Sequence, residues 1–353
     1  MNLLNLVPEA AETALRDWLS ARGEAAYRLR QLGPRLWQRP VARWTDASEL
    51  PRSLAAALDD DFPLPRLSLD TRQVSSDGTL KFLWRLPDGQ AVESVLIPEG
   101  RRQTLCVSSQ AGCAFGCVFC ATGRMGFVRH LEPWEIAAQV REMSFNPEWP
   151  RPTNVVFMGM GEPLHNWDAV DVALSILNSA TGCRLGARHI TVSTVGVLPN
   201  LAKLAQRPEQ FRLAVSLHAP TTERRLALMP VERKWPLDQL MAALRQFTRR
   251  VTFEYVMIRD RNDTAADAEA LARLARPLGA LVNLLPLHPG GTPGLEPTPV
   301  REIKGFAALL RDRGVRVSVR RSRGLDIKAA CGQLRVEVDH ARGVGPEQHA
   351  RVE

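Results

Sequence analysis

Three cysteines fall within one short stretch, Cys113-Ala-Phe-Gly-Cys117-Val-Phe-Cys120, directly after a strand-like run at 104–109. Thiolates select zinc, copper(I) or iron-sulfur clusters. A structural zinc site takes four protein ligands, and the nearest candidate for the fourth is His130, ten residues beyond Cys120. A [4Fe-4S] cubane held by three thiolates leaves one iron open to a small molecule, as an enzyme requires. The spacing therefore favours an iron-sulfur cluster over zinc.

Length and composition limit the class of protein. A chain of 353 residues can form one large α/β domain with one or two small accessories. Six cysteines, half of them in one loop, indicate a reduced cytoplasmic setting rather than a disulfide framework. Neither a signal peptide nor an apolar run of roughly 18 residues is visible, so we expect no membrane association. The net charge of +8 suggests a polyanionic partner or a solvated basic surface.

Changes in periodicity divide the chain into four segments. They are a helical accessory domain (1–62), a β-hairpin meander (63–100), the main domain with a C-terminal loop (101–334) and a polar tail (335–353). The first segment predicts helices at 11–22, 24–32 and 47–58, with a break at Gly33-Pro34. In the second segment, Asp77-Gly78 and Asp88-Gly89 separate alternating runs and predict antiparallel hairpins.

The main domain alternates buried strands with amphipathic helices. Strands are expected at 103–108, 154–160, 189–194, 212–217, 252–258, 280–285 and 315–319. Helices are expected at 134–143, 167–178, 237–247, 265–274 and 303–313. Repeated βα units predict an α/β fold with a parallel sheet, and about six units suit a partial (βα)6 barrel. Active sites of such folds gather at the C-terminal ends of the strands, which is where the cysteine loop falls.

Other polar positions follow the later strands. Gly159-Met160-Gly161-Glu162-Pro163 offers close backbone approach and a carboxylate that can pair with an ammonium group. Ser193, Ser216-Leu217-His218 and His288 also fall near strand ends, where ordinary loop capping is the alternative interpretation. Cys106 and Cys331 alone would be interpreted as an inert core thiol and an incidental thiol.

Taken in order, these motifs resemble the RlmN/Cfr family of radical S-adenosylmethionine (SAM) RNA methyltransferases over residues 91–334, and the likeness to RlmN members extends into the helical N-terminus. The resemblance is carried by Val92-Glu93, Leu105-Cys106-Val107-Ser108-Ser109-Gln110, the cysteine loop, Met158 to Leu164, Val192-Ser193-Thr194, Val215 to Pro220, Phe253 to Met257, Val319 to Gly324 and Ala329 to Leu334. It implies a radical SAM barrel with one [4Fe-4S] cluster on Cys113, Cys117 and Cys120.

The resemblance also implies the SAM contacts. The matching positions are Gly161, Glu162, Ser193, Ser216, Leu217, His218 and His288. His288 is a departure, because RlmN-like proteins more often have asparagine there. An imidazole can still form a hydrogen bond, so His288 remains in the expected set.

The family mechanism uses two SAM molecules per turnover. The resemblance implies that one SAM methylates Cys331, and that a 5′-deoxyadenosyl radical from the second abstracts hydrogen from this methyl group. The carbon radical then adds to the adenine. Glu93 matches the proton acceptor, and Cys106 matches the thiol that resolves the adduct through a transient disulfide with Cys331.

The implied partners are 23S rRNA, at C2 of adenosine 2503, and tRNA, at adenosine 37. A cytoplasmic monomer that receives electrons from a donor such as flavodoxin is expected. Arg320, Arg321 and Arg323, close to Cys331 in sequence, are candidates for phosphate contacts or a solvated charge run.

Three other functions account for parts of the sequence. A Cfr-like enzyme that methylates C8 of adenine shares the cluster and both thiols. A zinc-binding RNA module without catalysis is the alternative from another class. A radical SAM enzyme acting on a peptide or a small molecule leaves the contexts of Cys106 and Cys331 unexplained.

Overall fold

The computed structural model describes residues 1–288 and 292–334. The predicted tail at 335–353 lies outside the described residues. The strands are β1 (Ser68–Val74), β2 (Leu80–Arg85), β3 (Ala91–Glu99), β4 (Arg102–Cys106), β5 (Gln110–Gly112), β6 (Phe127–His130), β7 (Asn154–Phe157), β8 (Ile190–Thr194), β9 (Arg212–Ser216), β10 (Val251–Met257), β11 (Leu281–Pro286) and β12 (Arg316–Val319). Within this part of the chain they form a ten-stranded sheet, β1-β2-β3-β4-β7-β8-β9-β10-β11-β12, and a two-stranded sheet, β5-β6.

The helices alternate with the later strands. They are α1 (Pro8–Ala21), α2 (Arg28–Trp37), α3 (Arg52–Asp61), α4 (Ala121–Met125), α5 (Pro133–Arg141), α6 (Trp167–Asn178), α7 (Leu198–Gln206), α8 (Thr222–Leu228), α9 (Leu237–Arg245), α10 (Ala265–Ala275) and α11 (Val300–Asp312). Helices α7 and α8 are absent from the sequence prediction, because each has only two buried side chains to reveal its period. No helix in the described ranges is long and apolar enough to cross a bilayer.

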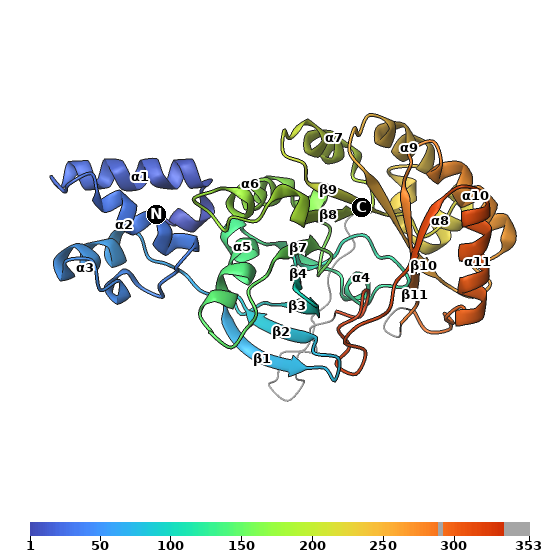
Figure 1. Cartoon of the computed structure of the whole chain (residues 1–353), viewed down its shortest axis with the longest axis horizontal. Coiled ribbons are helices and arrows are strands. Elements are labelled where there is room, and N and C mark those ends of the chain that lie inside the picture. The colour runs from blue at the N-terminus through green and yellow to red at the C-terminus, as the bar shows by residue number, and fades with distance from the viewer. Residues whose placement is uncertain (289–291, 335–353) are drawn as a thin grey trace.

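Helices α1, α2 and α3 form a lobe at one end of the molecule (Figure 1). The predicted break at Gly33-Pro34 is wrong, since α2 continues through it to Trp37. Pro34 removes one backbone hydrogen bond, but burial of Leu36 and Trp37 offsets this cost. The guanidinium of Arg141, in α5, is buried and donates from Nε to the carbonyl of Leu36 at 2.8 Å, which ties the lobe to the main sheet.

The meander continues directly into that sheet. Strands β1, β2, β3 and β4 pair antiparallel in succession. The two Asp-Gly turns lie between β1 and β2 and between β2 and β3, as predicted. Strand β4 then pairs parallel with β7, and the sheet stays parallel through β12.

The parallel strands and their helices form the predicted partial barrel. Helices α7, α9, α10 and α11 lie around the strands at the end away from the N-terminal lobe (Figure 1). The order of the large sheet is open, with β1 and β12 at its edges in the described part of the chain. Residues from the C-terminal ends of β7 to β11 line one common pocket, so the curvature of the sheet brings these ends together.

Candidate active site

The pocket at the strand ends encloses about 990 Å³, including the part open to solvent. Ten of the residues predicted from sequence line it: Cys113, Cys117, Cys120, Gly161, Glu162, Ser193, Ser216, His218, His288 and Cys331. The others, Glu93, Cys106 and Leu217, are buried and are not among the residues that line this pocket. Leu217 instead donates its backbone N–H to the carbonyl of Glu254 at 3.1 Å. The structure thus gathers most of the predicted site in one place.

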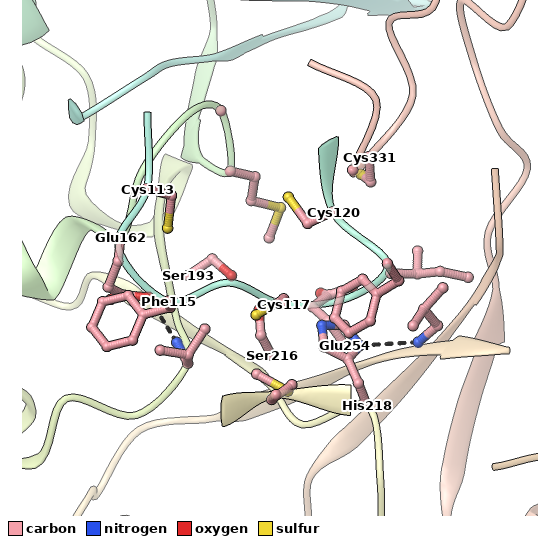
Figure 2. Close-up of a pocket in the computed structure, with 18 of the residues that line it drawn as sticks. Cys113, Phe115, Cys117, Cys120, Glu162, Ser193, Ser216, His218, Glu254 and Cys331 are labelled. Carbon is pink, nitrogen blue, oxygen red and sulfur yellow. Dashed lines mark hydrogen bonds between the residues drawn. The ribbon is translucent and has the colours of Figure 1, made fainter. Parts of the chain in front are cut away.

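The three cysteines of the loop between β5 and α4 surround one side of the pocket (Figure 2). Burial, with smaller contributions from the charges of Cys120 and Glu162, raises the pKa of Cys113 to about 12. Burial, followed by Cys120 and Cys113, also raises the pKa of Cys117. Buried thiols that disfavour one another's charge require a bound cationic group to become thiolates. The site therefore suits a metal centre.

The number of protein ligands distinguishes a cluster from a single zinc ion. A structural zinc site takes four protein ligands, and the cysteine loop supplies three thiols to the pocket. His130, the candidate fourth zinc ligand, is hydrogen bonded to Gln110 at 3.0 Å and is not among the pocket-lining residues. A [4Fe-4S] cubane, which separates its thiolate ligands, fits this donor set.

Glu162 is held beside the cysteines by the backbone. Its Oε1 accepts from the N–H of Leu164 at 3.0 Å, and its Oε2 accepts from the N–H of Val195 at 2.8 Å. A Cβ atom on Gly161, which has a φ of +98°, would lie 2.5 Å from the Cβ of Gln110. Only glycine lets the chain turn here against Gln110, whose Oε1 accepts from the N–H of Glu162 at 2.7 Å.

The Glu162 carboxyl gives a pH prediction for the cluster-free protein. Burial raises the pKa of Glu162 from 4.5 to about 7. Between these values the native state binds more protons than the unfolded state, so stability falls as pH rises, by about 3 kcal/mol in total. Urea unfolding from pH 4.5 to 8 should therefore show a steeper fall for wild type than for Glu162→Gln. Parallel stability curves for the two proteins would contradict this assignment.

His218 is a neutral hydrogen-bond donor in the pocket. Burial, with the nearby charge of Arg225, lowers the pKa of His218 to about 3. The backbone N–H of Val256 donates to Nδ1 of His218 at 3.0 Å, so the proton of the neutral ring lies on Nε2. The ring packs edge-on against Phe119 of the cysteine loop, with centroids 4.6 Å apart. Figure 2 shows His218 below Cys117, near Glu254.

A buried ion pair supports this side of the loop. Arg225, in α8, pairs with Glu232, and both side chains are almost fully buried. A second Arg225 nitrogen donates to the carbonyl of Val195 at 2.6 Å, and Glu232 also accepts from the N–H of Leu237 at 2.8 Å. The pair thus fixes α8 against the loop after β8.

Replacing Arg225 by leucine should lower the free energy of unfolding by about 3–5 kcal/mol, because it leaves the Glu232 carboxylate buried without its partner. Urea denaturation of the cluster-free protein measures this loss. The double variant Arg225→Leu/Glu232→Gln removes the charge and keeps an acceptor for Leu237, so it should recover most of the stability. Equal losses in the single and double variants would show that the uncompensated charge is not the cause.

Cys331 reaches the pocket through the C-terminal loop. The N–H of Ala121, next to Cys120, donates to the carbonyl of Gly332 at 2.8 Å, and Thr122 Oγ1 donates to the carbonyl of Leu334 at 2.7 Å. These bonds dock the loop on the start of α4. Cys331 is exposed and lies above Cys120 in Figure 2.

Cys106 lies at the end of β4, and Glu93 lies in the adjacent strand β3. Burial raises the pKa of the Cys106 thiol, and the charge of the Cys331 thiolate also raises it. Cys106 is opposite Val95 in the β3–β4 pair, and Glu93 is two residues from Val95. Glu93 and Cys106 therefore share one face of the sheet. Lys81 Nζ lies 3.0 Å from Glu93 Oε1 in an ion pair.

His288 lies just after β11 and contacts Ser322 of the C-terminal loop. Its Nε2 lies 2.5 Å from the hydroxyl of Ser322, and burial lowers the pKa of its ring. The side chain lines the pocket, so the departure from asparagine keeps a polar group there.

Glu254, in the middle of β10, lines the pocket and was not predicted as a site residue. Asn283 donates to its Oε1 at 2.9 Å, and burial raises the pKa of Glu254. The available signal was a lone carboxylate in the apolar run 251–258, because an unpaired acid in a buried strand requires a polar neighbour.

Comparison with known proteins identifies the family. Residues 107–275 match the Radical SAM superfamily. A protein of Gemmatimonas aurantiaca, named probable dual-specificity RNA methyltransferase RlmN, is 56% identical over 336 residues, which cover 95% of this chain and 93% of that protein. The chain belongs to the RlmN family. An Anaeromyxobacter relative, named dual-specificity RNA methyltransferase RlmN, is 46% identical and covers 92% of this chain and 88% of its own length.

A solved structure agrees with this RlmN-family assignment. The radical SAM methyltransferase from Sphaerobacter thermophilus superimposes with a TM-score of 0.89 at 43% identity, covering 96% of this chain and all of that one. Membership of the radical SAM superfamily implies a [4Fe-4S] cluster and SAM. The three thiols of the pocket, with Glu162 and the neutral His218 beside them, fit these two groups in chemistry and in number.

Proposed function

We propose that this RlmN-family enzyme methylates C2 of adenosine 2503 in 23S rRNA and of adenosine 37 in tRNA, with Cys331 carrying the methyl group. One observation carries the proposal: the exposed Cys331 lines the same pocket as Cys113, Cys117 and Cys120. C2 of adenine is electron-poor, so it cannot attack the SAM methyl group directly. A protein thiol that accepts the methyl group and presents it to the base avoids this barrier.

Cys331 and Cys106 have different roles in the proposed reaction. Cys331, as thiolate, takes a methyl group from one SAM. A [4Fe-4S] cluster held by Cys113, Cys117 and Cys120 would supply the electron for reductive cleavage of a second SAM, which would remove a hydrogen atom from the methyl group on Cys331. Cys106 would then attack the Cys331 sulfur and form an S–S bond as the sulfur–carbon bond breaks. The carbon would keep the electron pair of that bond, take up a proton and leave as the methyl group of the RNA.

Glu93 is the proton acceptor in this scheme. The carboxylate shares a sheet face with Cys106 and pairs with Lys81, so it lies beside the thiol pair rather than beside the cluster. It would accept the C2 proton of the adduct, because a positioned carboxylate next to the reacting carbon can serve as a general base. Gly161, Glu162, Ser193, Ser216, Leu217, His218 and His288 are proposed to hold SAM.

The proposal extends to partners and setting. RNA would approach over Arg320, Arg321 and Arg323, which precede the Cys331 loop and offer phosphate contacts. The target base must be splayed out before its edge reaches the methyl group. We propose a cytoplasmic monomer that receives electrons from a donor such as flavodoxin.

Anaerobic reconstitution tests the function. The protein is loaded with iron and sulfide, reduced with dithionite and incubated with SAM and either rRNA fragments or tRNA. Nucleoside mass analysis should show 2-methyladenosine, together with deoxyadenosine. Formation of 8-methyladenosine would overturn the C2 assignment in favour of Cfr-like chemistry. A colourless protein that contains zinc without iron or sulfide would overturn the enzyme assignment.

A further inference from the structure

Aromatic side chains form a continuous patch on one side of the cysteine loop. The patch consists of Phe115, Phe127, His130, His165 and Trp235. Ring centroids of Phe115 and His165 lie 5.3 Å apart, those of Phe115 and Trp235 lie 6.1 Å apart, and those of His130 and His165 lie 5.0 Å apart. Phe127 lies 5.0 Å from His130 and 5.8 Å from His165. The patch therefore runs from the pocket wall, which includes Phe115, to the protein surface.

The outer part of the patch is accessible. Phe127 is 36% exposed, and its neighbour Val128 is 44% exposed. Ala114 and Gly116, between the cluster ligands, are also exposed, so the loop itself reaches the surface here. Exposed apolar side chains grouped at a redox centre are typical of a contact surface rather than of a solvated face.

Strand β6 holds this surface in a fixed position. It pairs with β5, and the N–H of Cys113 donates to the carbonyl of Gly126 at 2.8 Å. A Cβ on Gly112 would lie 2.0 Å from that same carbonyl oxygen, so glycine is needed for the close approach. Any partner that contacts Phe127 or Val128 therefore contacts a segment whose preceding residue, Gly126, is hydrogen-bonded to Cys113.

The charge beside the patch is positive. Arg233 and Lys234 are exposed, and Lys234 Nζ lies 5.0 Å from the centroid of the Trp235 ring. Burial lowers the pKa values of both His130 and His165, so both rings are neutral near pH 7. A partner with carboxylates around an apolar centre matches this arrangement.

The RNA side of the pocket is elsewhere. Figure 2 shows Phe115 and Cys331 on opposite sides of the pocket. RNA must reach Cys331 to receive the methyl group, and the exposed arginines at 320, 321 and 323 precede Cys331 in the chain. The patch is thus left for the second macromolecule that the reaction needs, the source of electrons.

We propose that this aromatic patch, with Arg233 and Lys234, is the docking surface for a small acidic flavoprotein that donates one electron at a time. The inference rests on the proposed function, because reductive SAM cleavage consumes one electron. The donor's anionic flavin hydroquinone is oxidised to the neutral semiquinone, and the cluster gains that electron. No proton moves and no covalent bond changes. The docked flavin would face the cluster across the Phe115 side of the pocket.

Charge reversal at the two cations tests the docking surface in the reconstituted full-length protein. Arg233→Glu/Lys234→Glu is compared with Arg301→Glu/Lys304→Glu, which makes the same charge change on exposed positions of α11. Deoxyadenosine formation is measured with reduced flavodoxin and, separately, with dithionite. With flavodoxin, the patch variant should be slowed about tenfold at low salt and lose most of its salt dependence, whereas the α11 variant should match wild type.

Dithionite needs no docking surface, so both variants should cleave SAM at the wild-type rate with it. Their affinity for tRNA, measured by filter binding, should also match wild type. An unchanged flavodoxin rate would overturn the proposal, as would an equal loss with dithionite. Weakened tRNA binding by the patch variant alone would make the patch an RNA surface instead. Failure of the proposed function has a separate signature, because wild type would then form no deoxyadenosine with dithionite.

The apolar centre gives an independent test. Phe127→Ser changes an exposed side chain and leaves the net charge unchanged. It should raise the flavodoxin concentration needed for half-maximal rate several-fold and leave the dithionite rate unaltered. An unchanged flavodoxin dependence in this variant would also argue against docking at the patch.

Discussion

Replacing Cys331 by alanine is expected to abolish methylation of RNA while the protein still cleaves SAM. The thiol is exposed on the pocket rim, and no other described cysteine outside the cluster loop lines the pocket. Alanine keeps the backbone contact between Gly332 and Ala121, so the loop stays docked on α4. Nucleoside analysis should find no 2-methyladenosine, and peptide mass analysis should find no methylated residue at 331. Deoxyadenosine formation with dithionite should persist.

Cys183→Ala is the matched control. Cys183 follows α6 and is not among the residues that line the pocket. Burial raises the pKa of its thiol, and the charge of Arg141 lowers it. This variant should methylate RNA at the wild-type rate. Substantial 2-methyladenosine from the Cys331→Ala protein would show that the methyl group reaches RNA without this thiol.

The positions of the cluster loop and of the strand ends could be predicted from the sequence, because both depend on local spacing. Three cysteines within eight residues must lie on one loop wherever that loop goes. Parallel strands place their C-terminal ends at one edge, so Ser193, Ser216 and His218 were expected near that edge, and the family resemblance then assigned them to the SAM site. The structure places all of them in the pocket.

The unpredicted features depend on contacts between distant segments. Lys81 reaches Glu93 only because β2 and β3 pair in a register that brings them diagonally opposite. Glu254 faces the pocket because β10 lies beside β9 and β11 in the curved sheet. No local pattern specifies such registers, because strand pairing is set by the burial of whole faces.

Helix α2 shows the opposite limit, where a strong local signal fails. Gly33-Pro34 is a common helix breaker, and it predicted an end near Leu32. The structure continues the helix because Leu36 and Trp37 are buried beyond the break, and Arg141 donates to the Leu36 carbonyl. Tertiary burial outweighs the weaker local preference here.

Replacing Cys106 by alanine is expected to trap the enzyme covalently on its RNA. Methylation of Cys331 and addition to the adenine need no thiol at 106, so both steps should proceed. Release requires a second thiolate to attack the Cys331 sulfur, and the proposed attacking group is the buried Cys106 of β4, whose pKa the charge of Cys331 raises. Denaturing gels should therefore show a protein–RNA adduct that approaches one RNA per protein, with almost no free methylated product.

The double variant Cys106→Ala/Cys331→Ala distinguishes this adduct from tight binding. It keeps the cluster ligands and removes the sulfur that bonds to RNA, so the adduct should disappear while tRNA affinity is retained. Nuclease digestion of the single variant should leave a modified adenosine on the peptide that contains residue 331. An adduct at any other residue, or free 2-methyladenosine released at the wild-type rate, would show that Cys106 is not the resolving thiol. The burial that raises the pKa of Cys106 is consistent with this order, because a thiol that is mostly protonated attacks slowly until the adduct is in place.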